Sequence, residues 1–76
     1  MNQQEINRLN LKANALLELA QKMDRKIERL ELDIKQLKDY EWYVESRTKQ
    51  MEICKAGSKR LWNSYLLVLT QIKMIS

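Results

Sequence analysis

Carboxylates, a single thiol and a cluster of cations are the side chains of this chain whose types and spacing could do chemistry. Histidine, the commonest general base and metal ligand, is absent, and Cys54 is the one cysteine. One thiol cannot build a zinc site, which takes four ligands drawn mostly from Cys and His. Five acidic residues of the first half stand at mixed-charge spacings typical of a solvated helix face, and they are Glu18, Asp24, Glu28, Glu31 and Asp33. We therefore expect no enzyme activity, no catalytic residue, no metal site and no cofactor.

Cations gather around the only glycine, Gly57, in the stretch KAGSKRLW over residues 55–62. If a helix begins just after this glycine, its backbone N–H groups and the nearby cations form a site for an anion such as a nucleic-acid phosphate. Folding alone does not explain these cations, because the macrodipole disfavours positive charge at a helix start. Solvation, with Glu45 or Glu52 neutralising the cluster, is the alternative. The candidate anion patch comprises Lys55, Lys59, Arg60, Arg47 and Lys49.

Composition indicates helix along nearly the whole chain, and therefore an all-α fold. The 76 residues include no proline, one glycine and 32% charged residues. The net charge is +4, and the last 22 residues carry four basic and no acidic side chains. We expect a cytoplasmic location, because there is one cysteine, no apolar signal sequence at the start, and no apolar run of about twenty residues.

A heptad repeat runs through the first half of the chain, from residue 6 to residue 37. The gaps between apolar positions alternate three and four, which is typical of a coiled coil. One long helix packed in a globular bundle is the alternative. The predicted oligomer seam comprises Ile6, Leu9, Leu16, Met23, Ile27, Leu30, Ile34 and Leu37.

The residues beside this seam do not decide whether the paired helices run parallel or antiparallel. Ile at a with Leu at d favours a parallel dimer, and so does the pairing of Lys26 with Glu31 of a second chain. Alanines at two a positions let helices approach closely, while Leu17 and Leu19 widen the apolar stripe. Those features favour an antiparallel or higher-order assembly.

Gly57 predicts the place where the chain reverses, because glycine readily ends a helix and Ser58 can cap the next one. We expect a long helix over 1–55, a turn over 56–58 and a short amphipathic helix over 59–76. The short helix would cover the long one only from about residue 37 onward, leaving the heptad stripe in water. We therefore expect a helical hairpin assembled as a dimer: a coiled coil over 6–37, with 59–76 packing on 37–55 and on the partner chain. A different protein supplying the second strand is the alternative.

The pattern favours a non-enzymatic protein-interaction module, a coiled-coil homo-oligomer that adapts or inhibits a larger protein. Trp42, Tyr43 and Trp62 are candidate partner contacts, because Trp and Tyr are enriched among interface anchors. Alternatively, these rings fill the core. Nucleic-acid binding through the anion patch is the alternative function, and attachment of the basic helix 59–76 to a membrane surface is a third. The size and composition would also suit an accessory protein of a phage or other mobile element.

Overall fold

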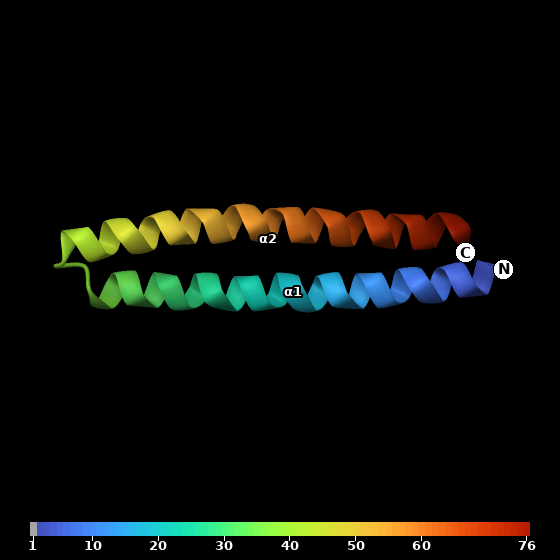
Figure 1. The fold of residues 1–76 in the computed structure, drawn as a ribbon, viewed down its shortest axis with the longest axis horizontal. Coiled ribbons are helices and arrows are strands. Elements are labelled where there is room, and N and C mark those ends of the chain that lie inside the picture. The colour runs from blue at the N-terminus through green and yellow to red at the C-terminus, as the bar shows by residue number, and fades with distance from the viewer. Residues whose placement is uncertain (1) are drawn as a thin grey trace.

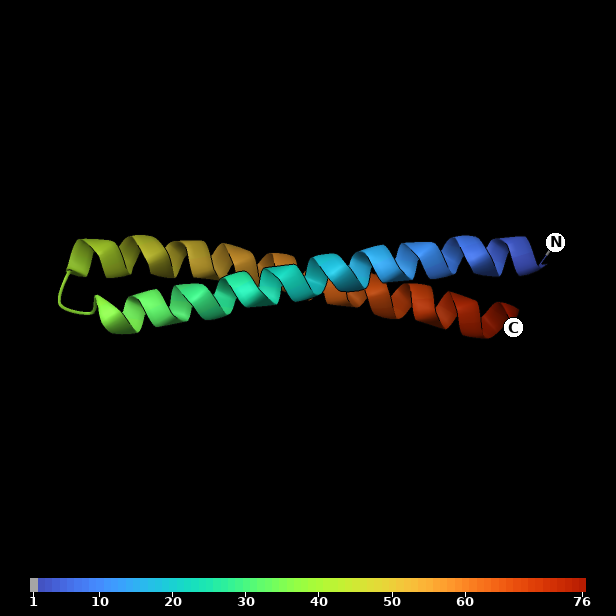
Figure 2. The same ribbon diagram turned by 90° about the horizontal axis from the view of Figure 1, so that it is seen from below.

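Two helices of equal length form a hairpin in the computed structural model, which describes residues 2–76 (Figure 1). Helix α1 runs Asn2–Gln36 and helix α2 runs Glu41–Ile75, each 35 residues long. They lie antiparallel, so that the start of α1 and the end of α2 share one end of a rod whose Cα atoms extend 59 × 14 × 12 Å. A second view shows the helices crossing near the middle of their length (Figure 2). Residues 2–76 contain no strand, and the predicted all-α helical hairpin is confirmed.

The chain reverses at residues 37–40, and not at the predicted turn over 56–58. Gly57 lies inside α2 and does not have a positive φ. The predicted division into a long helix over 1–55 and a short helix over 59–76 is therefore wrong. A glycine inside a helix costs only about 1 kcal/mol relative to alanine. That cost is small beside the apolar surface that a longer α2 covers.

Backbone hydrogen bonds close the turn between the helices. The Leu37 N–H donates to the Asp33 carbonyl at 3.0 Å, and the Tyr40 N–H donates to the Leu37 carbonyl at 3.0 Å. The Tyr40 carbonyl then accepts the N–H groups of Tyr43 and Val44, which starts α2. Residues 37–40 include neither glycine nor proline. The packing of two equal arms, more than local conformation, therefore selects this place.

Helix α1 packs its predicted heptad stripe against α2 of the same chain. Leu9, Ala13, Ala20 and Leu30 are buried, and the other residues of the stripe are half-buried. The stripe is thus the contact surface of α1, but the chain covers it without a partner. A second chain is not needed to cover this stripe, because α2 is about twice as long as the predicted helix over 59–76.

Helix α2 carries a second heptad repeat, which the sequence analysis missed. Every residue of this repeat is buried or half-buried against α1. A serine and an arginine interrupt the apolar pattern, which hides the repeat from a search for apolar periodicity. Its two alternating series are Val44, Met51, Ser58, Tyr65 and Ile72, and Arg47, Cys54, Leu61, Val68 and Ile75.

Small side chains on α1 let the two helices approach closely. Ala20 has no exposed surface, and Ala13 is only 4% exposed. Ala13 belongs to the buried cluster near the open end of the hairpin, together with Leu9 and Val68. Because interiors are packed to the density of organic crystals, a larger side chain at either alanine would force the helices apart.

Near the middle of the hairpin, one polar layer joins the helices. The Ser58 hydroxyl donates to Asp24 Oδ1 at 2.5 Å, and the Trp62 indole Nε1–H donates to Asp24 Oδ2 at 3.0 Å. The hydrogen bond from Ser58, and then that from Trp62, lower the pKa of Asp24, while partial burial acts in the opposite direction. A polar contact of this kind specifies register, since sliding one helix past the other would break both bonds.

Acidification is expected to weaken this layer. A carboxyl whose pKa is lowered on folding adds stability above its ordinary pKa of 3.8, and that contribution is lost as the pH falls through the lower value in the folded state. We expect Asp24→Asn to destabilise the hairpin at neutral pH, with the difference from wild type shrinking in acid. Urea denaturation between neutral pH and pH 3 measures this, and Glu28→Gln on the same helix is the control. Equal destabilisation by Asp24→Asn at every pH would contradict the assignment.

Candidate binding surfaces

The carboxylates and the single thiol are distributed along both helices. Within residues 2–76, no cluster of three or more His, Cys, Asp or Glu side chains could hold a metal ion. Cys54 is a free thiol, buried in the seam between the helices. In the same part of the chain, neither helix combines the length and apolar character needed to cross a membrane. The candidate binding sites lie on the surface of the rod.

The predicted anion patch is dispersed along α2. Its premise was a helix start at residue 58, whereas residues 55–60 lie in the interior of α2, where backbone N–H groups are bonded within the helix. Lys55, Lys59 and Arg60 are exposed, but Arg60 follows Lys59 directly and so points about 100° away from it. Lys49 pairs with Glu45 at 3.7 Å, and both side chains are 73% exposed. Arg47 alone of the five lies at the seam.

The predicted aromatic cluster separates into two groups. Near the turn, Trp42 is 73% exposed and contacts Tyr43 edge to face, with ring centroids 5.8 Å apart. Trp62 lies far along α2, half-buried, with its indole bonded to Asp24 and its ring edge to face with Tyr65. Trp62 therefore stabilises the hairpin, and Trp42 is the predicted contact residue that remains exposed.

A basic groove runs between the helices on the side of α1 that faces away from Asp24. We define it by its five cations, four of which come from α1 within eight residues and one from α2. The groove has a volume of about 640 Å³, and Leu30, Asp33 and Gln50 complete its lining. The cations are Lys22, Arg25, Lys26, Arg29 and Arg47.

Arg47 is the distinctive residue of the basic groove. It occupies a seam position of the α2 heptad repeat, where its guanidinium lies over the Tyr43 ring at 4.7 Å from the centroid. Its Nη1 donates to Gln50 Oε1 at 2.8 Å. Its Nε is buried and has no hydrogen-bond partner among residues 2–76. A half-buried cation with an unsatisfied donor has a free-energy cost that an anionic ligand would reduce.

The sequence contains a signal for the α1 side of this groove. Lys22, Lys26 and Arg29 follow the spacing of four and three residues that places side chains on one side of a helix. Asp24 and Glu28 stand between them in sequence and mask the charge, but neither lines the groove. The contribution of α2 depends on the position of the turn and could not be seen beforehand.

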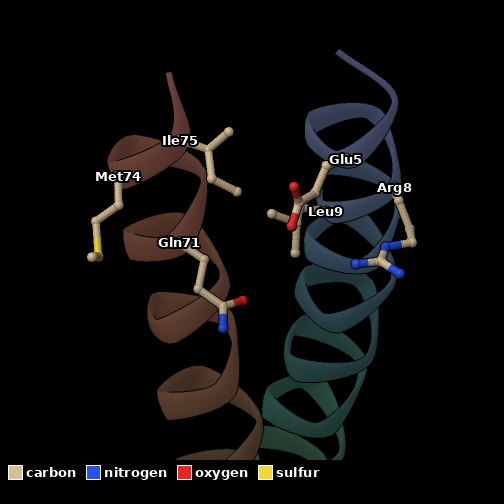
Figure 3. Close-up of a pocket in the computed structure, with 6 residues that line it drawn as sticks. All are labelled: Glu5, Arg8, Leu9, Gln71, Met74 and Ile75. Carbon is tan, nitrogen blue, oxygen red and sulfur yellow. The ribbon is translucent and has the colours of Figure 1, made fainter. Parts of the chain in front are cut away.

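An apolar face lies along the outside of α2, and we define it by Ile53, Leu66, Leu67 and Met74. Their exposed fractions are 73%, 58%, 65% and 81%. Ile53, Leu67 and Met74 are separated by multiples of seven residues, so they line up along the helix, with the exposed Arg60 between Ile53 and Leu67. At the open end of the hairpin, Met74 projects outward while the neighbouring Ile75 points toward α1 (Figure 3).

The open end also contains a smaller hollow, of about 250 Å³, between the first turns of α1 and the last turns of α2 (Figure 3). Leu9 and Ile75 form its apolar floor, and Glu5 and Arg8 supply one acid and one base from α1. Because the two charges compensate each other, this hollow has no preference for an ion of either sign. It is a less specific candidate than the basic groove.

No protein-family model, no curated protein and no solved structure matches this chain.

Proposed function

We propose that this chain is a non-enzymatic interaction module that self-associates through the apolar face of α2. The carrying observation is the line of exposed apolar side chains on the outside of that helix. Large apolar residues aligned on one surface are a mark of interaction sites, because a soluble protein rarely leaves them bare. This contact surface differs from the seam over 6–37, which is occupied within the chain.

The total surface of the hairpin supports association with another chain. The rod exposes 6295 Å², whereas a compact protein of its mass, 9.2 kDa, would expose roughly 4,900 Å². Few apolar side chains are buried in the described residues, and ten large ones are exposed. Pairing two hairpins side by side would reduce the exposed apolar area and build a four-helix core.

Charge along α2 favours a second copy of the same chain as the partner. Glu45 and Glu52 lie in its first half, and Lys59 and Lys73 lie in its second half, all in one line at multiples of seven residues. Two α2 helices packed antiparallel would place Glu45 and Glu52 of each beside the lysines of this line on the other. Such a contact uses the same patch twice, as two-fold symmetry requires.

Sedimentation equilibrium with matched variants tests this proposal. Wild type is expected at twice its chain mass of 9.2 kDa. Leu67→Lys combined with Met74→Lys is expected to give a helical monomer, because lysine keeps helix propensity and places charge on the face. Leu11→Lys combined with Leu32→Lys, at leucines 72% and 58% exposed on α1, is the control and should remain dimeric. A monomeric wild type at high micromolar concentration would contradict self-association, and so would equal dissociation by the control.

A further inference from the structure

We propose that the basic groove binds the sugar–phosphate backbone of a double-stranded nucleic acid. The site shares Arg47 with the predicted anion patch and contains none of its other four cations, and it involves none of the residues of the apolar face. It is a function additional to self-association, because it depends on the charge of α1 and on Arg47.

The groove has a strong excess of positive charge. Its lining carries five cations and a single acid, Asp33. The ion pair of the described residues lies elsewhere, between Lys49 and Glu45, so no carboxylate stands within 4 Å of a groove cation. Two acids adjoin groove cations in sequence but do not line the groove: Asp24 is bonded to Ser58 and Trp62 of α2, and Glu28 is exposed. Cations gathered on one wall without acids raise the local potential and attract a polyanion.

The spacing of the cations fits a phosphate backbone. From Lys22 to Arg29 the helix rises about 10 Å, whereas phosphates along one strand of duplex DNA follow one another every 3.4 Å or so of axis. The α1 cations therefore span about three phosphates. Arg47 reaches the same groove from the other helix, already oriented by Tyr43 and Gln50. Its unpartnered Nε supplies a donor that a phosphate oxygen can accept.

The lining favours a nucleic-acid backbone over an acidic protein or a single strand. Protein interfaces depend on apolar and aromatic anchors, but Leu30 is the apolar residue of the lining and is only 6% exposed. Single-strand binding depends on aromatic rings that stack on bases, and no ring lines the groove. A groove lined by cations and few hydrogen-bond acceptors contacts the charged backbone and not the base edges. Binding is therefore expected to be independent of the base sequence.

Arg47 gives the proposal a distinctive signature. An arginine at a seam position breaks the apolar rule of the repeat, and such exceptions are typical of functional residues. Arg47→Met would place a flexible apolar side chain in the seam and remove the unsatisfied donor. We expect this variant to raise the melting temperature while weakening nucleic-acid binding. A lower melting temperature would show that Arg47 is retained for packing, and would overturn its role in the site.

Fluorescence anisotropy with short labelled duplexes of random sequence tests the groove. Wild type is expected to bind duplex DNA or duplex RNA at low salt, and the two probes show which backbone it prefers. Lys26→Gln combined with Arg29→Gln is expected to weaken binding at least about tenfold and to reduce the salt slope by about 2. Lys55→Gln combined with Lys59→Gln removes the same charge elsewhere on the rod, and is expected to leave the affinity unchanged.

Three outcomes would overturn the proposal. The first is that the wild type binds neither duplex at low salt. Equal weakening by the two double variants would show that net charge, and not the groove, attracts the nucleic acid. Binding of a polyglutamate peptide as tight as that of DNA would assign the groove to an acidic protein partner. Circular dichroism of each variant shows whether the hairpin remains folded.

Discussion

Ala13→Asp is expected to unfold the hairpin, while Ala15→Asp, two residues further along the same helix, leaves it folded. Ala13 is 4% exposed in the cluster with Leu9 and Val68, and Ala15 is exposed. An aspartate at residue 13 would bury a charge without a partner, at a cost of about 3 kcal/mol or more. A single core in a chain of this length supplies roughly 3–5 kcal/mol, so that cost removes most of the stability.

The exposed alanine makes this comparison a controlled one. Both variants lose the same residue type and gain the same side chain in the interior of α1, so their helix propensities change equally. Ala15→Asp should change the free energy of unfolding by no more than about 0.5 kcal/mol beyond that shared loss. Urea denaturation followed by far-ultraviolet circular dichroism measures both. Equal destabilisation by the two variants would mean that the seam does not pass through Ala13.

Substitutions of Gly57 are expected to act in opposite directions. Gly57→Ala should stabilise the protein by about 0.5–1 kcal/mol, because α2 runs through this residue and alanine is the better helix former. A Cβ at this position would meet the Met23 methyl carbon at 3.5 Å, which is ordinary van der Waals contact. Gly57→Pro should cost about 3 kcal/mol or more, since proline breaks the interior of a helix.

The sign of the Gly57→Ala effect separates two folds. If Gly57 ended a helix in the left-handed conformation, alanine would be strained there and the variant would be less stable. Thermal denaturation of wild type and both variants measures the signs. Destabilisation by Gly57→Ala would contradict the continuous α2.

The heptad repeat over 6–37 and the all-helical composition were sufficient to predict two packed helices and the contact surface of α1. The position of the turn could not be derived from local signals, because Gly57 is the strongest local stop and the fold passes through it. The lengths of the two arms are the better indication of where the chain reverses. Two arms of 35 residues cover each other completely, and Ser58 and Arg47 occupy regular positions in the second repeat.

Predicting the candidate sites requires the position of the turn even more than predicting the fold does. Around Gly57 the cations are close in sequence but lie on different sides of a continuous helix. In the stretch from Lys22 to Arg29, acids alternate with cations in sequence, and only helical geometry separates them. Arg47 reaches the groove because the chain reverses at residues 37–40. Sequence therefore revealed the charges, while the fold determined which of them act together.

The distance between two spin labels tests most directly that the chain folds back on itself at residues 37–40. Asn7→Cys and Lys73→Cys, both exposed, would be labelled in a Cys54→Ala background and diluted with unlabelled chain to suppress contacts between molecules. The hairpin predicts labels about 15–25 Å apart, because packed helix axes lie 8–10 Å apart and each label adds a short tether. A turn at 56–58 would put residue 73 beside residue 41, roughly 50 Å along the helix from residue 7. A distance near that larger value would contradict the fold, and with it the basic groove and the apolar face.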